Sequence, residues 1–218
     1  MDLLIIPGLA TPYAKKYEAV YNLLITEAKR RSYNDIVITR FPGQADQDDQ
    51  FDGVLTIKNS VDIVISAIKA FEETKSPFRI IGRSFGCQIT LLATSQIKTS
   101  WLDKIVLWGP TPSWLQWQCA NDRYAEIYKD ALDKGTHISS KEVFRDIQPV
   151  EIALPSVEFS TLVSTGTDDE YSPPTFITYL QALCKDKNHI TFAVVEGCAH
   201  SVTTESLGWR QYISLMLD

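Results

Sequence analysis

The chain has 218 residues, of which 44% are hydrophobic and 22% charged, and its formal net charge is −6. These values are typical of a globular protein, and we expect one domain with a sizeable core over residues 1–218. The negative charge and the lack of a lysine- or arginine-rich run argue against a nucleic-acid partner or an anionic membrane.

The four cysteines, at positions 87, 119, 184 and 198, show no spacing typical of a metal site. Reduced thiols in the cytoplasm are the simplest interpretation, and we expect no metal. No signal peptide is visible, and no apolar run approaches the roughly 20 residues that cross a bilayer.

Apolar runs and segments of helical period alternate along the chain. The first run, residues 3–6, suggests a strand buried on both faces, and Thr11 and Pro12 then open a helix. Further strands are expected over residues 35–39, 78–82, 104–108, 159–163 and 190–195. Helices are expected over residues 57–71, 85–96, 121–133 and 140–146, after Ser172-Pro173-Pro174, and through Leu207, Tyr212, Ile213 and Met216. This alternation predicts an α/β protein with a six-stranded, mostly parallel, doubly wound sheet.

The segment 110–156 breaks this alternation and is predicted to form a small helical cap inserted between the fourth and fifth strands. Its aromatic side chains either line an acyl or aromatic pocket or pack the cap onto the body of the domain. They are Trp114, Trp117, Tyr124 and Tyr128.

A strand that turns directly into a helix is predicted around Gly82-x-Ser84-x-Gly86. Such a reversal strains the backbone of the central residue, and a Cβ on either glycine would collide with the neighbouring strand or helix. The Ser84 hydroxyl would then stand at the top of the sheet, above a helix N-terminus. Because this pattern occurs by chance in roughly 7% of chains of this length, distant residues must decide its meaning.

A serine hydroxyl is a weak nucleophile unless a base removes its proton and an acid orients that base. Of the three histidines, His137 lies in the inserted segment and His189 precedes the sixth strand, at the opposite end of the sheet. Only His200 follows a strand at the edge where Ser84 is expected. The loop after the fifth strand supplies three adjacent carboxylates, at positions 168, 169 and 170. One of them would orient the imidazole, and the others favour the N-terminus of the next helix.

Gly82-x-Ser84-x-Gly86, Gly166-x-x-Asp169 and Gly197-x-x-His200, each behind an apolar strand, resemble the α/β-hydrolase superfamily over nearly the whole chain. The order serine, acid, histidine is that of the superfamily. The resemblance implies a sheet of α/β-hydrolase type and a triad of Ser84, Asp169 and His200. The glycine-plus-three spacing favours Asp169, with Asp168 as the alternative.

The resemblance also implies an oxyanion hole built from the backbone amides of Phe85 and Leu9, with Ala10 as an alternative to Leu9. Two features depart from the superfamily. The chain begins at what would be the third strand of relatives, so the usual N-terminal hairpin is missing. Arg83 precedes the nucleophile, where relatives often carry an uncharged or histidine side chain. It either forms a salt bridge beneath the turn or binds a carboxylate or phosphate of the substrate.

These residues predict a serine hydrolase, of carboxylesterase or thioesterase type, that cleaves a small-to-medium acyl substrate through an acyl-enzyme and needs no cofactor. Peptidases, lactonases, acyltransferases and carbon–carbon-bond hydrolases use the same triad. The alternative function is a ligand-binding sensor that keeps the fold and turns over negligibly. A nucleotide-binding protein is disfavoured, because no G-x-G-x-x-G follows the first strand. The oligomeric state stays open.

Overall fold

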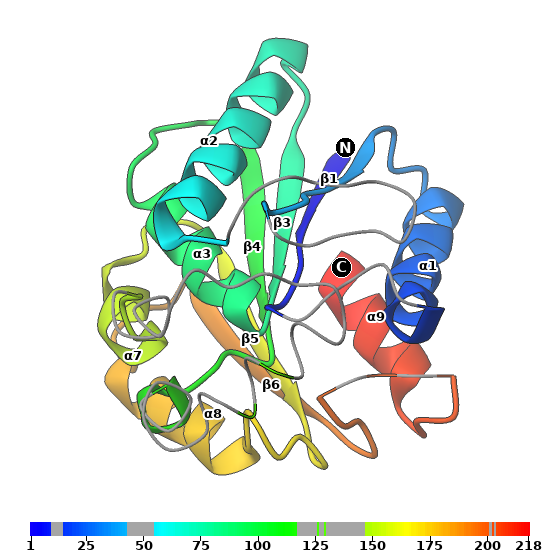
Figure 1. The fold of residues 1–218 in the computed structure, drawn as a ribbon, viewed down its shortest axis with the longest axis vertical. Helices are drawn as coiled ribbons and strands as arrows, with labels where there is room; N and C mark the ends of the chain where they lie inside the picture. Colours follow the sequence, from blue (N-terminus) through cyan, green and yellow to red (C-terminus); the bar gives the residue numbers. More distant parts are fainter. Residues whose placement is uncertain are drawn as a thin grey trace.

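A six-stranded sheet, in which every strand pair is parallel, organises the computed structural model (Figure 1). The structure describes residues 1–9, 15–42, 55–116, 126, 129, 147–200, 202 and 204–218, and only the backbone of residues 15–20. The strands are β1 (Asp2–Ile6), β2 (Ile36–Ile38), β3 (Phe78–Arg83), β4 (Leu102–Trp108), β5 (Thr161–Gly166) and β6 (Ile190–Val195). Their order across the sheet is β2-β1-β3-β4-β5-β6.

The predicted number and direction of the strands are confirmed, and β6 has the predicted bounds. The predicted bounds of β5 were wrong at both ends, because the strand spans Thr161–Gly166 and not residues 159–163. Ser164 and Thr165 extend it as fully buried polar residues. Thr165 satisfies its hydroxyl by donating to the Ser172 carbonyl.

Helices cover both faces of the sheet (Figure 1). On one side lie α1 (Lys15–Arg30) and α9 (Trp209–Leu217), which contact each other. On the other side lie α2 (Ile57–Thr74), α3 (Phe85–Thr94), α7 (Val150–Ala153), the short 3₁₀ helix η1 (Leu154–Ser156) and α8 (Pro174–Leu183). Each layer encloses its own cluster of buried apolar side chains, so the inner strands of the sheet are buried on both faces, as predicted for β1, while the edge strands β2 and β6 are partly exposed.

Local signals explain where several helices begin and end. The Thr56 hydroxyl accepts a hydrogen bond of 3.0 Å from the Asn59 amide and caps α2, which ends at Lys75 in a left-handed conformation. The predicted last helix was wrong at its start: Leu207 is 85% exposed in a turn, and α9 begins at Trp209.

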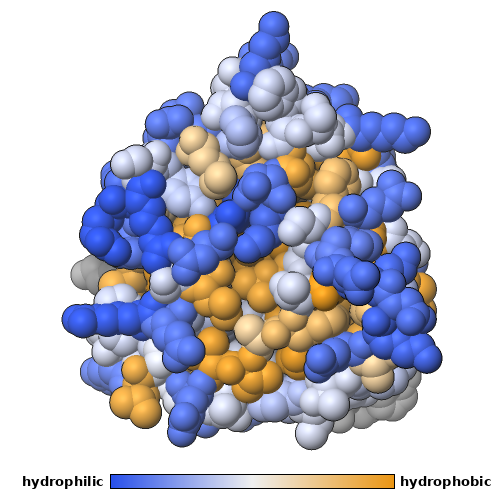
Figure 2. Space-filling model, turned by 180° about the vertical axis from the view of Figure 1, so that it is seen from behind, coloured by the Kyte–Doolittle hydropathy of each residue, from blue (hydrophilic) through white to orange (hydrophobic). Residues whose placement is uncertain are grey.

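Most of the predicted cap lies outside the described residues, as do the predicted helix opening at Thr11 and Pro12 and the predicted helices over 121–133 and 140–146, apart from positions 126 and 129. The described end of the cap forms α7 and η1, which the sequence analysis did not predict. Seen from behind, the molecule shows apolar side chains in the middle of one face, bordered by hydrophilic ones (Figure 2). Among the described residues, no helix is both long and apolar enough to cross a membrane.

Candidate active site

Ser84 sits in the sharp turn between β3 and α3. Its backbone has φ 52° and ψ −121°, and its amide donates a hydrogen bond of 2.9 Å to the Trp108 carbonyl at the end of β4. A Cβ at Gly82 would lie 2.7 Å from the Gly86 carbonyl oxygen, and a Cβ at Gly86 would lie 2.6 Å from the Pro7 carbonyl oxygen. The predicted strained turn is therefore present, and both glycines are required by close backbone approach.

Asp169 and His200 form a pair at the same edge of the sheet. The His200 Nδ1 lies 3.0 and 2.9 Å from the two carboxylate oxygens of Asp169. The carboxylate is only 2% exposed. It also accepts hydrogen bonds from the amides of Tyr171 and Ser172, at 3.0 and 2.8 Å, and from the Thr165 hydroxyl at 3.2 Å. The two amides thus fix the carboxylate, the Thr165 hydroxyl shares its single proton between this carboxylate and the Ser172 carbonyl, and the carboxylate faces the imidazole.

Gly109 connects this pair to the turn that holds the serine. It follows Trp108, whose carbonyl accepts the Ser84 amide, and it has a positive φ of 58°. A Cβ at Gly109 would lie 3.0 Å from Asp169 Oδ2 and 3.1 Å from His200 Nδ1, so the pair packs directly against this backbone. The hydrogen bonds of the described residues include none from the Ser84 hydroxyl to the His200 imidazole. Such contacts often tighten only when substrate is bound.

Backbone from the loop after β1 approaches Ser84 from another side. A Cβ at Gly8 would lie 3.3 Å from the Cβ of Ser84. Leu9, which follows, is partly buried and packs against the cluster on the α2–α3 side. Phe85 is the first residue of α3, and the first amides of a helix lack partners within that helix. The two amides predicted for the oxyanion hole thus belong to segments next to Ser84.

Arg83, the last residue of β3, is buried beside this site. Its Nη2 donates a hydrogen bond of 3.0 Å to the His200 carbonyl, and its guanidinium carbon lies 5.1 Å from the centre of the Trp108 ring. Both contacts are made with groups of this chain. The prediction that Arg83 binds substrate stays a prediction.

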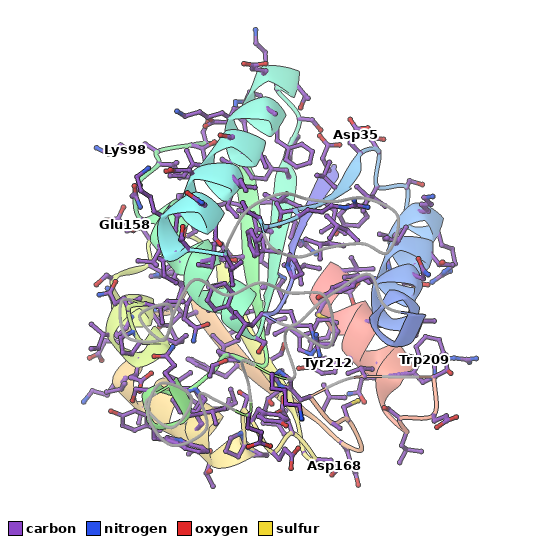
Figure 3. The ribbon with its side chains drawn as sticks, in the orientation of Figure 1. Asp35, Lys98, Glu158, Asp168, Trp209 and Tyr212 are labelled. Atoms are coloured by element: carbon purple, nitrogen blue, oxygen red, sulfur yellow. The ribbon has the colours of Figure 1, made fainter. Side chains whose placement is uncertain are left out.

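Asp168, the alternative acid, points elsewhere. Its side chain is exposed, accepts a hydrogen bond from the neighbouring Thr167 hydroxyl and lies at the lower rim of the molecule (Figure 3). His189 lies at the amino end of β6 with Nε2 2.8 Å from the Val157 carbonyl oxygen, as the sequence predicts. The geometry therefore pairs His200 with Asp169.

The thiol of Cys87 lies under the serine turn. Its sulfur donates toward the carbonyl oxygens of Gly82 and Trp108, at 3.1 and 3.4 Å. Complete burial raises the pKa of this thiol far above its usual range. Cys87 is therefore a packing residue beneath the turn, and its thiol has little tendency to ionise.

Among the aromatic residues predicted to bind substrate, only Trp114 is described, and it is 48% exposed at the start of the cap. Trp117, Tyr124 and Tyr128 lie outside the described residues. Among the residues that the structure describes, no cluster of three His, Cys, Asp or Glu side chains could hold a metal ion.

Sequence reasoning missed three residues that complete the site: Thr165, Tyr171 and Ser172. Two of them fix the Asp169 carboxylate through backbone amides, which no sequence motif reveals. The Tyr171 ring also packs against the His200 ring, with 5.1 Å between ring centres. The only available signal was the position of Thr165 directly before Gly166, where a buried strand ends.

Neither a protein-family model nor a curated protein matches this sequence. Solved structures do match it. An esterase from Exiguobacterium antarcticum superposes with a TM-score of 0.66 at 15% identity, covering 100% of this chain and 92% of the esterase. A monoacylglycerol lipase from Paleococcus ferrophilus gives 0.65 at 16% identity, covering 99% of this chain and 93% of the lipase.

A meta-cleavage product hydrolase from Pseudomonas fluorescens IP01 gives a TM-score of 0.63 at 17% identity, covering 100% of this chain and 89% of that enzyme. These neighbours are hydrolases, and the strand order and the turn around Ser84 are those of their fold. The chain has the α/β-hydrolase fold.

Proposed function

We propose that the protein is a serine hydrolase that cleaves an ester or thioester of a small-to-medium acyl substrate. The observation that carries the proposal is the Asp169–His200 pair, which lies against Gly109 beside the strained turn of Ser84. A fixed carboxylate, an imidazole and a hydroxyl at one sheet edge are the groups that acyl transfer requires. The hydrolases named above support this class of reaction.

In this proposal the Ser84 hydroxyl attacks the acyl carbonyl while His200 Nε2 takes its proton. Asp169 holds the Nδ1–H tautomer and stabilises the imidazolium that forms. The amides of Phe85 and Leu9 donate to the oxyanion, and each donor lowers the barrier by on the order of 3 kcal/mol. The imidazolium returns its proton to the departing alcohol or thiol. Water, activated by the same imidazole, then attacks the acyl-enzyme and frees the acid and Ser84.

The substrate class rests on chain length and on the described part of the cap. A chain of 218 residues leaves little room for extended subsites, which favours small-to-medium acyl groups. The exposed indole of Trp114 is proposed to contact the acyl group, because it stands in the segment that follows Gly109. Truncation by Trp114→Ala should then raise KM for longer esters more than for acetate esters.

A fluorophosphonate probe tests the nucleophile directly. Wild type should be labelled and Ser84→Ala should not, while Ser95→Ala, which removes an exposed serine at the other end of the same helix, should be labelled like wild type. Hydrolysis of p-nitrophenyl esters and acyl thioesters graded by chain length should follow the labelling. Circular dichroism of each variant shows whether the fold is kept.

The ligand-binding sensor makes the opposite prediction. Correctly folded wild type would then resist the probe and hydrolyse no ester or thioester of the panel, which would refute the hydrolase. The sensor draws no support from the neighbours named above. A cytoplasmic location stays a prediction, although Cys87, Cys184 and Cys198 are all free thiols.

A further inference from the structure

Arg83 places a cation inside the protein at the residue before the proposed nucleophile. It is only 3% exposed. Burying a guanidinium is costly unless the protein replaces its hydration with well-placed acceptors and ring contacts. What Arg83 contacts is therefore the guide to its role.

The guanidinium contacts groups at or beyond the ends of two strands and lies near the loop that follows a third. Nη2 donates to the carbonyl of His200, beyond β6, and Cζ lies over the ring of Trp108, at the end of β4. Nη1 lies 3.7 Å from the position a Cβ would take at Gly8, beyond β1. One side chain thus joins the segment that carries the imidazole to the strand end that holds Ser84.

The Trp108 ring is in turn packed against the ring of a buried tyrosine. It meets the ring of Tyr212 edge-on with 5.6 Å between centres, and Tyr212 lies between α9 and the sheet (Figure 3). Arg83 and Trp108 are direct neighbours in the β3–β4 register, so the cation rests on a ring in a fixed strand. The guanidinium can therefore hold the His200 carbonyl in place instead of moving with it.

We infer that Arg83 is a positioning residue that sets the place of His200 relative to Ser84. Asp169 fixes the imidazole from the side of Nδ1, and Arg83 fixes the backbone of the same residue from the side of the nucleophile. The inference rests on the proposed function, because its catalytic consequence is the alignment of base and nucleophile. A displacement of about 1 Å at such a site lowers the rate by up to about 100-fold.

The test compares Arg83→Met and Arg83→Lys with wild type on a neutral ester and on an ester with a carboxylate in its acyl chain. We expect kcat of Arg83→Met to fall by about 10- to 100-fold for both esters, with KM changed by less than about 3-fold. Arg83→Lys keeps the charge and one donor and should recover part of kcat. A rise in KM confined to the anionic ester would instead assign Arg83 to substrate recognition and overturn the inference.

Arg79 supplies a matched control on the same strand. It is 4% exposed and lies four residues earlier, where it donates to the Met216 carbonyl and to Asp103 at the opposite edge of the sheet. Arg79→Met should lower the melting temperature yet leave kcat per folded enzyme unchanged. An equal loss of kcat in both methionine variants would mean that Arg83 acts only through stability, and would overturn the inference.

A second readout does not need turnover. In a Ser84→Ala background, the downfield proton NMR signal of the His200 Nδ1–H bound to Asp169 reports the imidazole directly. We expect this signal to broaden or shift in Arg83→Met and to stay unchanged in Arg79→Met. A signal unaffected by Arg83→Met would overturn the inference even in an active enzyme. Wild type that is inactive and unlabelled by the fluorophosphonate would instead overturn the proposed function, and the NMR comparison would still decide the role of Arg83.

Discussion

Replacing Ser84 by glycine should stabilise the protein while it abolishes the proposed activity. The angles φ 52° and ψ −121° are those of the first central residue of a type II′ turn, where glycine is favoured. Holding a residue with a Cβ in such a conformation costs on the order of 1–3 kcal/mol. Glycine gives back roughly 0.5–1 kcal/mol through its greater freedom in the unfolded chain. At the middle of both ranges, the free energy of unfolding should therefore rise by about 1.3 kcal/mol.

The matched control is Ser84→Ala, which removes the same hydroxyl but keeps the Cβ and hence the strain. An unfolding entropy of about 2.1 cal/mol/K per residue gives about 0.46 kcal/mol/K for 218 residues. Ser84→Gly should therefore melt about 2–4 °C above Ser84→Ala, and Ser84→Ala within about 1 °C of wild type. Differential scanning calorimetry measures both. If the glycine variant melts at or below the alanine variant, the backbone of the turn stores no strain and the reasoning is wrong.

Three further predictions test the site and the fold. Asp169→Asn should lower kcat for ester hydrolysis by about 10³- to 10⁴-fold, because an amide does not stabilise the imidazolium. The control, Asp168→Asn, should change kcat by less than about 2-fold. The reverse ranking would identify Asp168 as the acid. Gly86→Ala would place a Cβ 2.6 Å from the Pro7 carbonyl oxygen, and should lower the free energy of unfolding in urea by about 3 kcal/mol or more. Hydrogen bonds from Arg30 and Arg31 lower the pKa of Glu27 from 4.5 to about 2. The contribution of these ion pairs to the free energy of unfolding is therefore present above pH 4.5 and is lost as the pH falls toward 2. Glu27→Gln should therefore cost less than about 1 kcal/mol at pH 7, and a melting-temperature difference from wild type that widened in acid would contradict this.

The bounds of β6 could be read from the sequence, whereas those of β5 could not. The run from Ile190 to Val195 is bounded by polar residues at both ends, and β6 has those bounds. By contrast, Ser164 and Thr165 are as fully buried as the apolar residues of β5. Their burial depends on partners such as the Ser172 carbonyl, which lies seven positions further along the chain and is brought near only by the turn after β5.

The same limit applies to the candidate site. Chain order and glycine spacing led to Ser84 and His200, because short turns after parallel strands constrain the local sequence. The choice between Asp168 and Asp169 depends instead on which side chain points inward. The structure buries Asp169 among two amides, a hydroxyl and the imidazole, and leaves Asp168 exposed. The glycine-plus-three spacing of the superfamily favours Asp169, but the two adjacent carboxylates themselves carry no signal for which of them is buried.

Strand β3 carries two buried arginines, and the contacts that offset the cost of burying each charge differ. Arg79 is a charge buried within a strand, but the carboxylate of Asp103 lies 2.8 Å from its Nη2, so an ion pair offsets its burial. Arg83, a charge buried four residues later, donates to the His200 carbonyl and lies over the Trp108 ring, and the Ser84 backbone that follows it has a conformation suited to glycine. A sequence selected for stability alone would replace both Arg83 and Ser84. Their presence together at the edge that holds the Asp169–His200 pair is what a strained, preorganised site requires, and it is the physical reason to look for the chemistry there.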